Sequence, residues 1–282
     1  MSSFILGDKS YAQGKKSLKA LKNQFSNPTT IYLSINIKIT IVRTKDYTPR
    51  IIPITHKLDK VENKSVLLIT KDPSTPYRDA LTAKDSPTED VFNQIFTLTK
   101  LKSIARDPKK VYKLFKEYDI VVADNRVHKF LPTILGGQFY IKNKKVPYMI
   151  QMAKPSAESQ AQLVRGKKST KLKDDRCEPK YVKQQMKAIV GNTSYIPSSS
   201  GNCLFIRVGS TEWPIEHILH NINDVLQYLI DTKYGPVGGV LKSIDNLGNI
   251  HIKTSESISL PLYTPTEITN DDEDDDNSDY DF

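Results

Sequence analysis

Alternation of apolar and polar residues dominates the first part of the chain. From residue 31 to residue 41 every second residue is isoleucine or leucine, and polar residues stand between most of them. This period of two predicts a long strand with one buried and one wet face. Before it, residues 15–25 place three apolar side chains on one helical face and four lysines on the other, which predicts an amphipathic helix.

The middle of the chain has a different pattern. Residues 66–70 and 120–123 are continuous apolar runs, which are typical of strands covered on both faces of a parallel sheet. Residues 147–152 are expected to form a third or edge strand. Helical patterns lie between these runs at 75–81, 88–96, 108–118 and 125–135. Alternating strands and helices predict a three-layer α/β/α unit.

Half-exposed strands return after residue 200, at 204–208 and 250–253, on either side of a strongly periodic helix at 215–230. A helix at 178–190 precedes them. The order predicts an α/β protein of two domains, in which a split α+β outer domain surrounds an inserted domain. The outer domain is expected to comprise residues 1–60 and 155–265, and the inserted domain residues 61–153, with a hinge near residues 60 and 154. Residues 49–57 are expected to be an extended connection because of their prolines.

Charge points to a polyanionic partner. The chain carries 41 basic and 32 acidic residues, a net charge of +9, but nine of the acidic residues follow residue 266. The rest of the chain therefore has 41 basic and 23 acidic residues, a net charge of +18. Such a charge favours binding to nucleic acid, because each neutralised phosphate releases condensed counterions. A membrane is disfavoured because no lysine-rich helix has aromatic residues on its apolar face. Residues 266–282 are expected to be a disordered acidic tail, which either competes with nucleic acid or only aids solubility.

Catalytic and metal-binding patterns are missing from the sequence. Asp124, at the end of a buried strand, is expected to cap the helix that begins at Asn125. The phosphate-binding pattern G-x-G-x-x-G does not occur, and no two histidines stand four residues apart around a glutamate. Cys177 and Cys203 are isolated, as expected for reduced intracellular thiols. We therefore expect a non-enzymatic protein without a cofactor or metal.

Two basic clusters are candidates for RNA contact. Residues 154–176 lose almost all apolar character and are expected to form a flexible basic loop. Its candidate phosphate ligands are Arg165, Lys167, Lys168, Lys171 and Lys173. The cluster from Lys142 to Lys145 has three interpretations that the sequence leaves open: a nuclear import signal, an RNA contact, or a solubilising turn.

Residues 119–152 resemble the ribosomal protein L1 family. This segment combines a strand ending in aspartate, a helix, a Leu-Pro turn, Leu-Gly, an aromatic residue, a basic turn and Val-Pro. The segments RIIPITHK (50–57), VLLITKDP (66–73) and CLFIRVG (203–209) are also similar to the family, so that the resemblance spans roughly residues 15–262. The likeness is strongest to the eukaryotic ribosome-biogenesis branch, and to its fungal member associated with the small-subunit processome.

The resemblance implies an outer domain that contacts RNA through the wet face of its first strand and through its last strand. The corresponding candidates here are Lys38 with its neighbours, and Lys253, Thr254 and Ser255. Further candidates for RNA contact are the basic residues that follow the first strand: Arg43, Arg50, His56 and Lys57. The ribosomal members carry Ser/Thr-Met-Gly-Pro after the last strand, whereas this chain has Ser255-Glu256-Ser257-Ile258. Because the glycine is missing and a carboxylate is present, we expect RNA contact to depend more on charged side chains here.

These observations predict a pre-ribosomal RNA-binding factor of the nucleus and nucleolus that acts in small-subunit rRNA processing. Its expected partners are pre-ribosomal RNA and assembly proteins, with the chain monomeric inside a large ribonucleoprotein particle. Two alternatives are a mature large-subunit protein of the L1 stalk and a nucleotide-dependent enzyme using the α/β domain.

Overall fold

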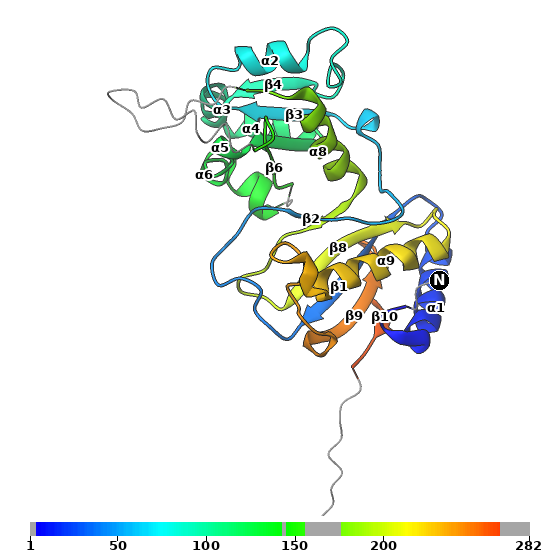
Figure 1. Ribbon diagram of the computed structural model, residues 1–282. Coiled ribbons are helices and arrows are strands. Elements are labelled where there is room, and N and C mark those ends of the chain that lie inside the picture. The colour runs from blue at the N-terminus through cyan, green and yellow to red at the C-terminus, as the bar shows by residue number, and fades with distance from the viewer. Residues whose placement is uncertain (1–3, 143–144, 156–175, 266–282) are drawn as a thin grey trace, which may run out of the picture.

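Two four-stranded sheets organise the chain. The computed structural model describes residues 4–142, 145–155 and 176–265. One sheet, the split sheet, takes its strands from both ends of the chain, and the other, the inserted sheet, from the residues between them (Figure 1). A short ribbon of β2 (Arg50–Ile52) and β7 (Thr193–Tyr195) pairs two segments that lie between these sheets in the chain order.

The split sheet is antiparallel throughout, in the order β10-β9-β1-β8. Its strands are β1 (Thr30–Ile37), β8 (Cys203–Ser210), β9 (Leu247–Lys253) and β10 (Leu260–Tyr263). Alternate residues of β1 are buried, as the period of two predicts. The strand is shorter than predicted, however. It ends at Ile37 because the chain bends there, and the Lys38 N–H leaves the ladder to donate to Asn246 O in η4 (Ile244–Asn246).

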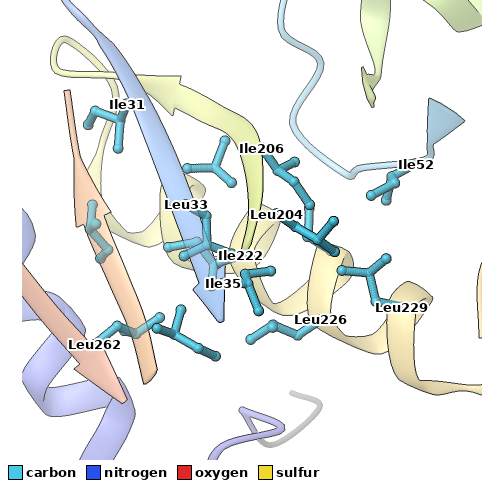
Figure 2. Close-up of a cluster of buried hydrophobic side chains, with 14 of the residues drawn as sticks. Ile31, Leu33, Ile35, Ile52, Leu204, Ile206, Ile222, Leu226, Leu229 and Leu262 are labelled. Carbon is cyan, nitrogen blue, oxygen red and sulfur yellow. The ribbon is translucent and has the colours of Figure 1, made fainter. Parts of the chain in front are cut away.

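Helices α1 (Gly7–Gln24) and α9 (Ile215–Ile230) cover one face of the split sheet. Figure 2 shows side chains of β1, β8 and α9 meeting in this core, among them Leu33, Ile206 and Ile222, each of which is fully buried. Burying such a side chain contributes about 1.5–3 kcal/mol. The periodic helix predicted at 215–230 is confirmed with the same bounds, because its apolar stripe is the part that packs.

The inserted sheet is parallel, in the order β4-β3-β5-β6. Its strands are β3 (Val66–Thr70), β4 (Gln94–Thr97), β5 (Ile120–Asp124) and β6 (Tyr148–Ile150), with β6 at the edge. All five residues of β3 are buried, because helices lie on both faces. One face packs on α2 (Thr75–Leu81), and the other on α3 (Leu98–Ala105), α4 (Pro108–Glu117), α5 (Asn125–His128) and α6 (Leu131–Gly137).

Two helix predictions are wrong in this part of the chain. Residues 88–96 end in strand β4 rather than forming a helix, because residues 94–97 pair in parallel with β3 and bury Ile95 and Phe96. The helix expected at 125–135 is divided into α5 and α6. Pro132, in the first turn of the second helix, has no N–H to continue a hydrogen-bond ladder from the first.

Helix α8 (Pro179–Gly191) lies with the inserted sheet. Its residues Val182, Met186 and Ile189 share a buried cluster with Leu68 and Val122 of that sheet. The sequence-based boundary at residue 155 places this helix in the outer domain instead. Local periodicity shows that the helix has an apolar face, but not which of two apolar surfaces the face will cover. The remaining short helical turns are η1 (Val61–Asn63), η2 (Gln138–Lys142) and η3 (Thr232–Tyr234).

Candidate nucleic-acid interface

The split sheet has a second face, called the open face here, which is turned away from α1 and α9. It is formed by the residues that alternate with the buried ones: Tyr32, Ser34 and Asn36 of β1, Cys203, Phe205 and Arg207 of β8, and Asn249, His251 and Lys253 of β9. All of these residues are partly or well exposed. The open face is therefore a polar and aromatic surface on a rigid sheet.

Strand register orders the open face into rows. Tyr32 lies opposite Arg207 on one side and Lys253 on the other, which gives a row of cation, aromatic ring and cation. The next row is His251, Ser34 and Phe205. The rings of Tyr32 and Phe205 stack between these rows, with centroids 4.5 Å apart and planes 17° apart. Although it is stacked, Phe205 remains 48% exposed.

This combination of groups suits single-stranded or looped RNA. Exposed aromatic rings stack on unpaired bases, and flanking cations neutralise phosphates. Neither group alone would distinguish nucleic acid from another ligand. Neighbouring strands lie roughly 5 Å apart, so the aromatic and cationic groups of one row are close enough to contact the base and the phosphate of a single nucleotide. The open face is the candidate RNA-binding surface.

Of the sequence-predicted residues, Lys253 lies on the open face, whereas Lys38 and Arg43 lie beyond the other end of β1. Both are exposed. Lys38 is six residues from Tyr32, the neighbour of Lys253, so that the two lysines stand roughly 20 Å apart along the strand. The structure thus places Lys253 and Lys38 toward opposite ends of β1.

Arg50 and Lys57 form internal contacts. Arg50 donates to Pro236 O at 3.3 Å and lies 3.7 Å from the Asp46 carboxylate. The Lys57 ammonium donates to Ile54 O and to Asn192 Oδ1, both at 2.7 Å. These bonds hold the connection after β1 in place, so both side chains have a structural role that their charge in the sequence does not reveal.

His56 packs on α9, on the helical side of the split sheet. Its ring stacks on His217 with centroids 3.8 Å apart, and its Nε2 lies 3.3 Å from Nδ1 of His220. The backbone N–H of His56 donates to the buried Asn221 side chain at 2.9 Å. The site of His56 is therefore separate from the open face.

A pH dependence of stability follows from this stack. Burial and the neighbouring His217 and His220 lower the pKa of His56 below 6.5, against the opposing effect of Asp224. The unfolded chain therefore binds the proton more tightly, and the free energy of unfolding is expected to decrease as the pH falls through 6.5. Urea denaturation of wild type and His56→Asn between pH 5 and 8 checks this, with a shallower slope expected for the variant. A slope in the variant as steep as that of the wild type would contradict the role of His56.

The predicted lysine cluster at 142–145 is partly structural. Lys142 is exposed, but the Lys145 ammonium donates to Phe115 O at 2.5 Å and to Tyr118 O at 2.8 Å, at the end of α4. Lys145 therefore helps to hold the inserted domain together. Lys144 lies outside the described residues, as do Arg165, Lys167, Lys168, Lys171 and Lys173 of the predicted basic loop.

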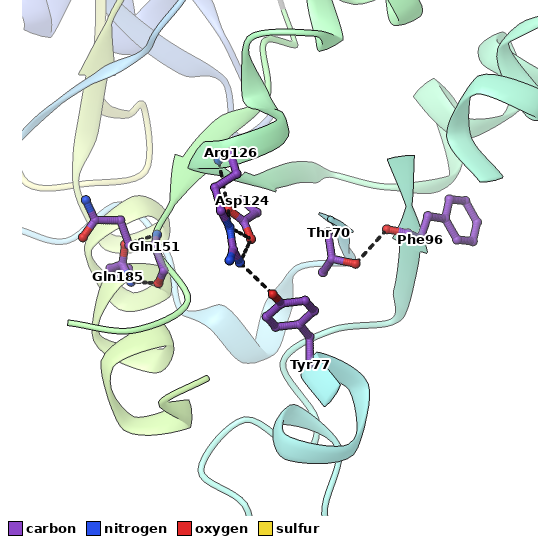
Figure 3. A network of polar contacts seen from close by, with 7 residues as sticks. All are labelled: Thr70, Tyr77, Phe96, Asp124, Arg126, Gln151 and Gln185. Carbon is purple, nitrogen blue, oxygen red and sulfur yellow. Dashed lines mark hydrogen bonds and ion pairs between the residues drawn. The ribbon is translucent and has the colours of Figure 1, made fainter. Parts of the chain in front are cut away.

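Asp124 caps α5, as predicted. Its carboxylate is fully buried, accepts from the Arg126 N–H at 2.9 Å, and forms an ion pair with the guanidinium of the same residue (Figure 3). Arg126 also donates to the hydroxyl of the buried Tyr77 at 2.9 Å. Both carboxylate oxygens are engaged in structure, as the capping interpretation requires. Among the described residues, no three His, Cys, Asp or Glu side chains are grouped as metal ligands.

The sequence matches the pattern of the Ribosomal protein L1p/L10e family over residues 13–258, which covers most of the chain and every strand of both sheets except β10. The chain belongs to the ribosomal protein L1 family. The α/β fold expected from the resemblance is confirmed. Every helix among the described residues is too short or too polar to span a membrane.

Relatives of this L1-family protein include the ribosome biogenesis protein UTP30 of Saccharomyces cerevisiae, which is 40% identical over 94% of each chain. A putative ribosome biogenesis protein of Schizosaccharomyces pombe is 28% identical over 70% of this chain and 44% of its own. The mouse ribosomal L1 domain-containing protein 1 is 25% identical over 76% of this chain and 40% of its own.

The turn after β9 differs from the expectation based on the L1-family resemblance. Thr254 is fully buried, and its hydroxyl accepts from the N–H groups of Glu256 and Ser257 at 3.3 and 3.0 Å. In return, Ser257 Oγ accepts from the Thr254 N–H at 2.9 Å. Thr254 thus stabilises the turn from inside, and Ser255 is the exposed member of the predicted pair.

Sequence reasoning missed the four residues that give the open face its rings and its second cation: Tyr32, Phe205, Arg207 and His251. A signal for them was present, because Leu204, Ile206 and Val208 alternate with Phe205 and Arg207 in the sequence. The alternation assigns both to the wet face of β8. What it does not contain is the register that brings them beside Tyr32.

Proposed function

We propose that this protein is a ribosome-biogenesis factor that binds structured pre-ribosomal RNA on its open face during small-subunit rRNA processing. The observation that carries the proposal is the cross-strand row of Lys253, Tyr32 and Arg207, with Phe205 stacked beside it. Similarity to the ribosome biogenesis protein UTP30 along 94% of both chains supports the process.

The mechanism is scaffolding, without turnover. Cations at both ends of the open face neutralise phosphates of folded RNA and fix its orientation, because phosphate contacts position a nucleic acid without reading its sequence. The sheet supplies a rigid surface, which favours one shape of RNA over others. Holding two RNA segments in a fixed arrangement would assist the folding of a precursor as the particle assembles.

The proposed setting is the nucleolus, with pre-ribosomal RNA and pre-ribosomal assembly proteins as partners and no cofactor. The protein would act as a monomer within the particle. Sedimentation of the tagged protein from cell extracts checks this setting: an assembly factor runs with precursor particles and is absent from finished subunits. Presence in mature large subunits would instead indicate a stalk protein.

Salt dependence of binding is the direct test. If Lys38, Lys253 and Arg207 contact three phosphates, affinity for a structured RNA should fall by roughly 40-fold as monovalent salt rises from 50 to 200 mM, since each contact contributes about 0.9 to the logarithmic slope. Fluorescence anisotropy with a labelled RNA measures it. An affinity that changes less than about threefold over this range would contradict the proposal.

A further inference from the structure

Unsatisfied polar atoms concentrate in one part of the molecule. Among the described residues, three buried side-chain atoms have no hydrogen-bond partner: Tyr140 Oη, Thr193 Oγ1 and Arg207 Nε. An unpaired buried polar group costs about 1–3 kcal/mol, and folded proteins contain few of them. All three residues line the cleft between the open face and the inserted sheet. These atoms are themselves buried, so a polar ligand in that cleft would reach them after small side-chain movements.

The cleft consists of two adjoining cavities. The wider one, of about 600 Å³, is lined by Phe205 and Tyr140, and the narrower one, of about 440 Å³, by Arg207 and Thr193. Tyr32, Val146, Tyr148 and Ser194 line both. Each cavity falls within the range of about 300–1,000 Å³ that is usual for small-ligand sites. Because they share these lining residues, the two cavities lie side by side, and they are called the wide end and the narrow end of the cleft.

The narrow end favours an anion. Arg207 enters it from the open face, and within the described part of the chain no carboxylate forms an ion pair with this guanidinium. The other charged groups that line it already have partners: Lys64 pairs with Asp59 at 2.8 Å, the Asp119 carboxylate accepts from the N–H and hydroxyl of Ser65, and Lys145 donates to backbone carbonyls. A partly exposed guanidinium that has no carboxylate partner is a strong donor to phosphate.

The wide end favours a flat aromatic group. Phe205 stacks on Tyr32 with one ring face and is still 48% exposed. The tyrosines Tyr47, Tyr140 and Tyr195 line the same cavity. Aromatic side chains around an open space of this size provide a stacking site for a planar ring.

An anion and a planar ring at adjoining ends of one cleft are the two parts of a nucleotide. We propose that the cleft receives one unpaired nucleotide of the bound RNA, with its base stacked on Phe205 and its phosphate on Arg207. This inference rests on the proposed RNA-binding function and adds to it a preference for RNA with an extruded residue. A base inside an A-form duplex cannot reach the cleft, because its faces are covered by stacking.

The test compares two RNA duplexes that differ by one bulged 2-aminopurine nucleotide, with the full-length protein in both cases. Wild type is expected to bind the bulged duplex about 5- to 150-fold more tightly, the range for stacking one base on an aromatic side chain, and to change the fluorescence of the probe. Phe205→Ala and Arg207→Gln should abolish this preference. Phe205→Trp, which keeps an aromatic ring, should retain it.

Tyr112→Ala is the matched control, because Tyr112 on α4 is also 48% exposed and lies outside the cleft. It should leave the preference unchanged. Equal, salt-sensitive binding of both duplexes by wild type would overturn the nucleotide site and leave the proposed function standing. No binding of either RNA would overturn both. Displacement of the bulged duplex by free nucleoside monophosphates below millimolar concentration would assign the cleft to a free nucleotide instead.

Discussion

Charge reversal of Lys38, Arg43 and Lys253 together is expected to lower the affinity for structured RNA by about 100-fold or more at 50 mM salt. Lys253 lies on the open face, and Lys38 and Arg43 follow the far end of β1. Each phosphate interaction that is removed also lowers the logarithmic salt slope by about 0.9. Because Lys38 and Arg43 are exposed and form no ion pair among the described residues, their substitution should leave the fold intact. Anisotropy titrations at several salt concentrations measure both quantities.

A matched control separates local contacts from net charge. Reversal of Lys9, Lys16 and Lys19 changes the total charge by the same amount on α1, which covers the opposite face of the split sheet. All three are exposed. This variant should bind RNA within a few-fold of wild type and keep its salt slope. Equal decreases in affinity for the two triple variants would indicate that RNA responds only to overall charge, and the open face would have no special role.

Asp124→Ala is expected to lower the free energy of unfolding by about 3 kcal/mol. The substitution removes the cap of α5 and leaves the Arg126 guanidinium in a half-buried site without its carboxylate. The value lies at the lower end of the range for broken buried pairs, because 30% of the Arg126 side chain is exposed and water can partly solvate it. Urea denaturation monitored by circular dichroism gives the difference.

Asp107→Ala provides the comparison for this substitution. Asp107 caps α4 in the same way, accepting from the Lys109 N–H at 2.9 Å, but no ion pair of Asp107 occurs among the described residues. Its removal should cost about 1 kcal/mol, the usual contribution of a cap. If both variants were destabilised by the same amount, the pair of Asp124 and Arg126 would contribute no net stability beyond the cap.

Much of the fold could be predicted where a local pattern carries the information. The period of two marks the buried residues of β1, continuous apolar runs mark β3 and β5, and helical spacing marks α9. Asp124 after a buried strand marks a cap. Strand β4 could not be predicted in this way, because its conformation comes from pairing with β3, whose residues stand 27 positions earlier in the chain.

The candidate site could be predicted only in part. Lys253 was expected on the surface and lies there, but Thr254, the next residue of the same predicted group, is buried in its own turn. Arg50 and Lys57 have the charge of RNA ligands and are held by carbonyl and amide groups of distant segments. The sequence shows that a side chain is a charged donor, but it does not show which group of the folded chain will accept its hydrogen bonds.

The sequence by itself determined the faces of the strands, the insertion of an α/β/α unit into a split α+β unit, the excess of basic over acidic residues before residue 266, and the resemblance to the L1 family. Each depends on residue type and local spacing, which are present before folding. Tertiary structure alone decided that Tyr32 stands between Arg207 and Lys253, that Phe205 stacks on Tyr32, and that α8 joins the inserted sheet. These arrangements join residues far apart in the chain or select between two apolar surfaces. They follow from the register and packing that give the lowest free energy for the whole chain, which no local pattern contains.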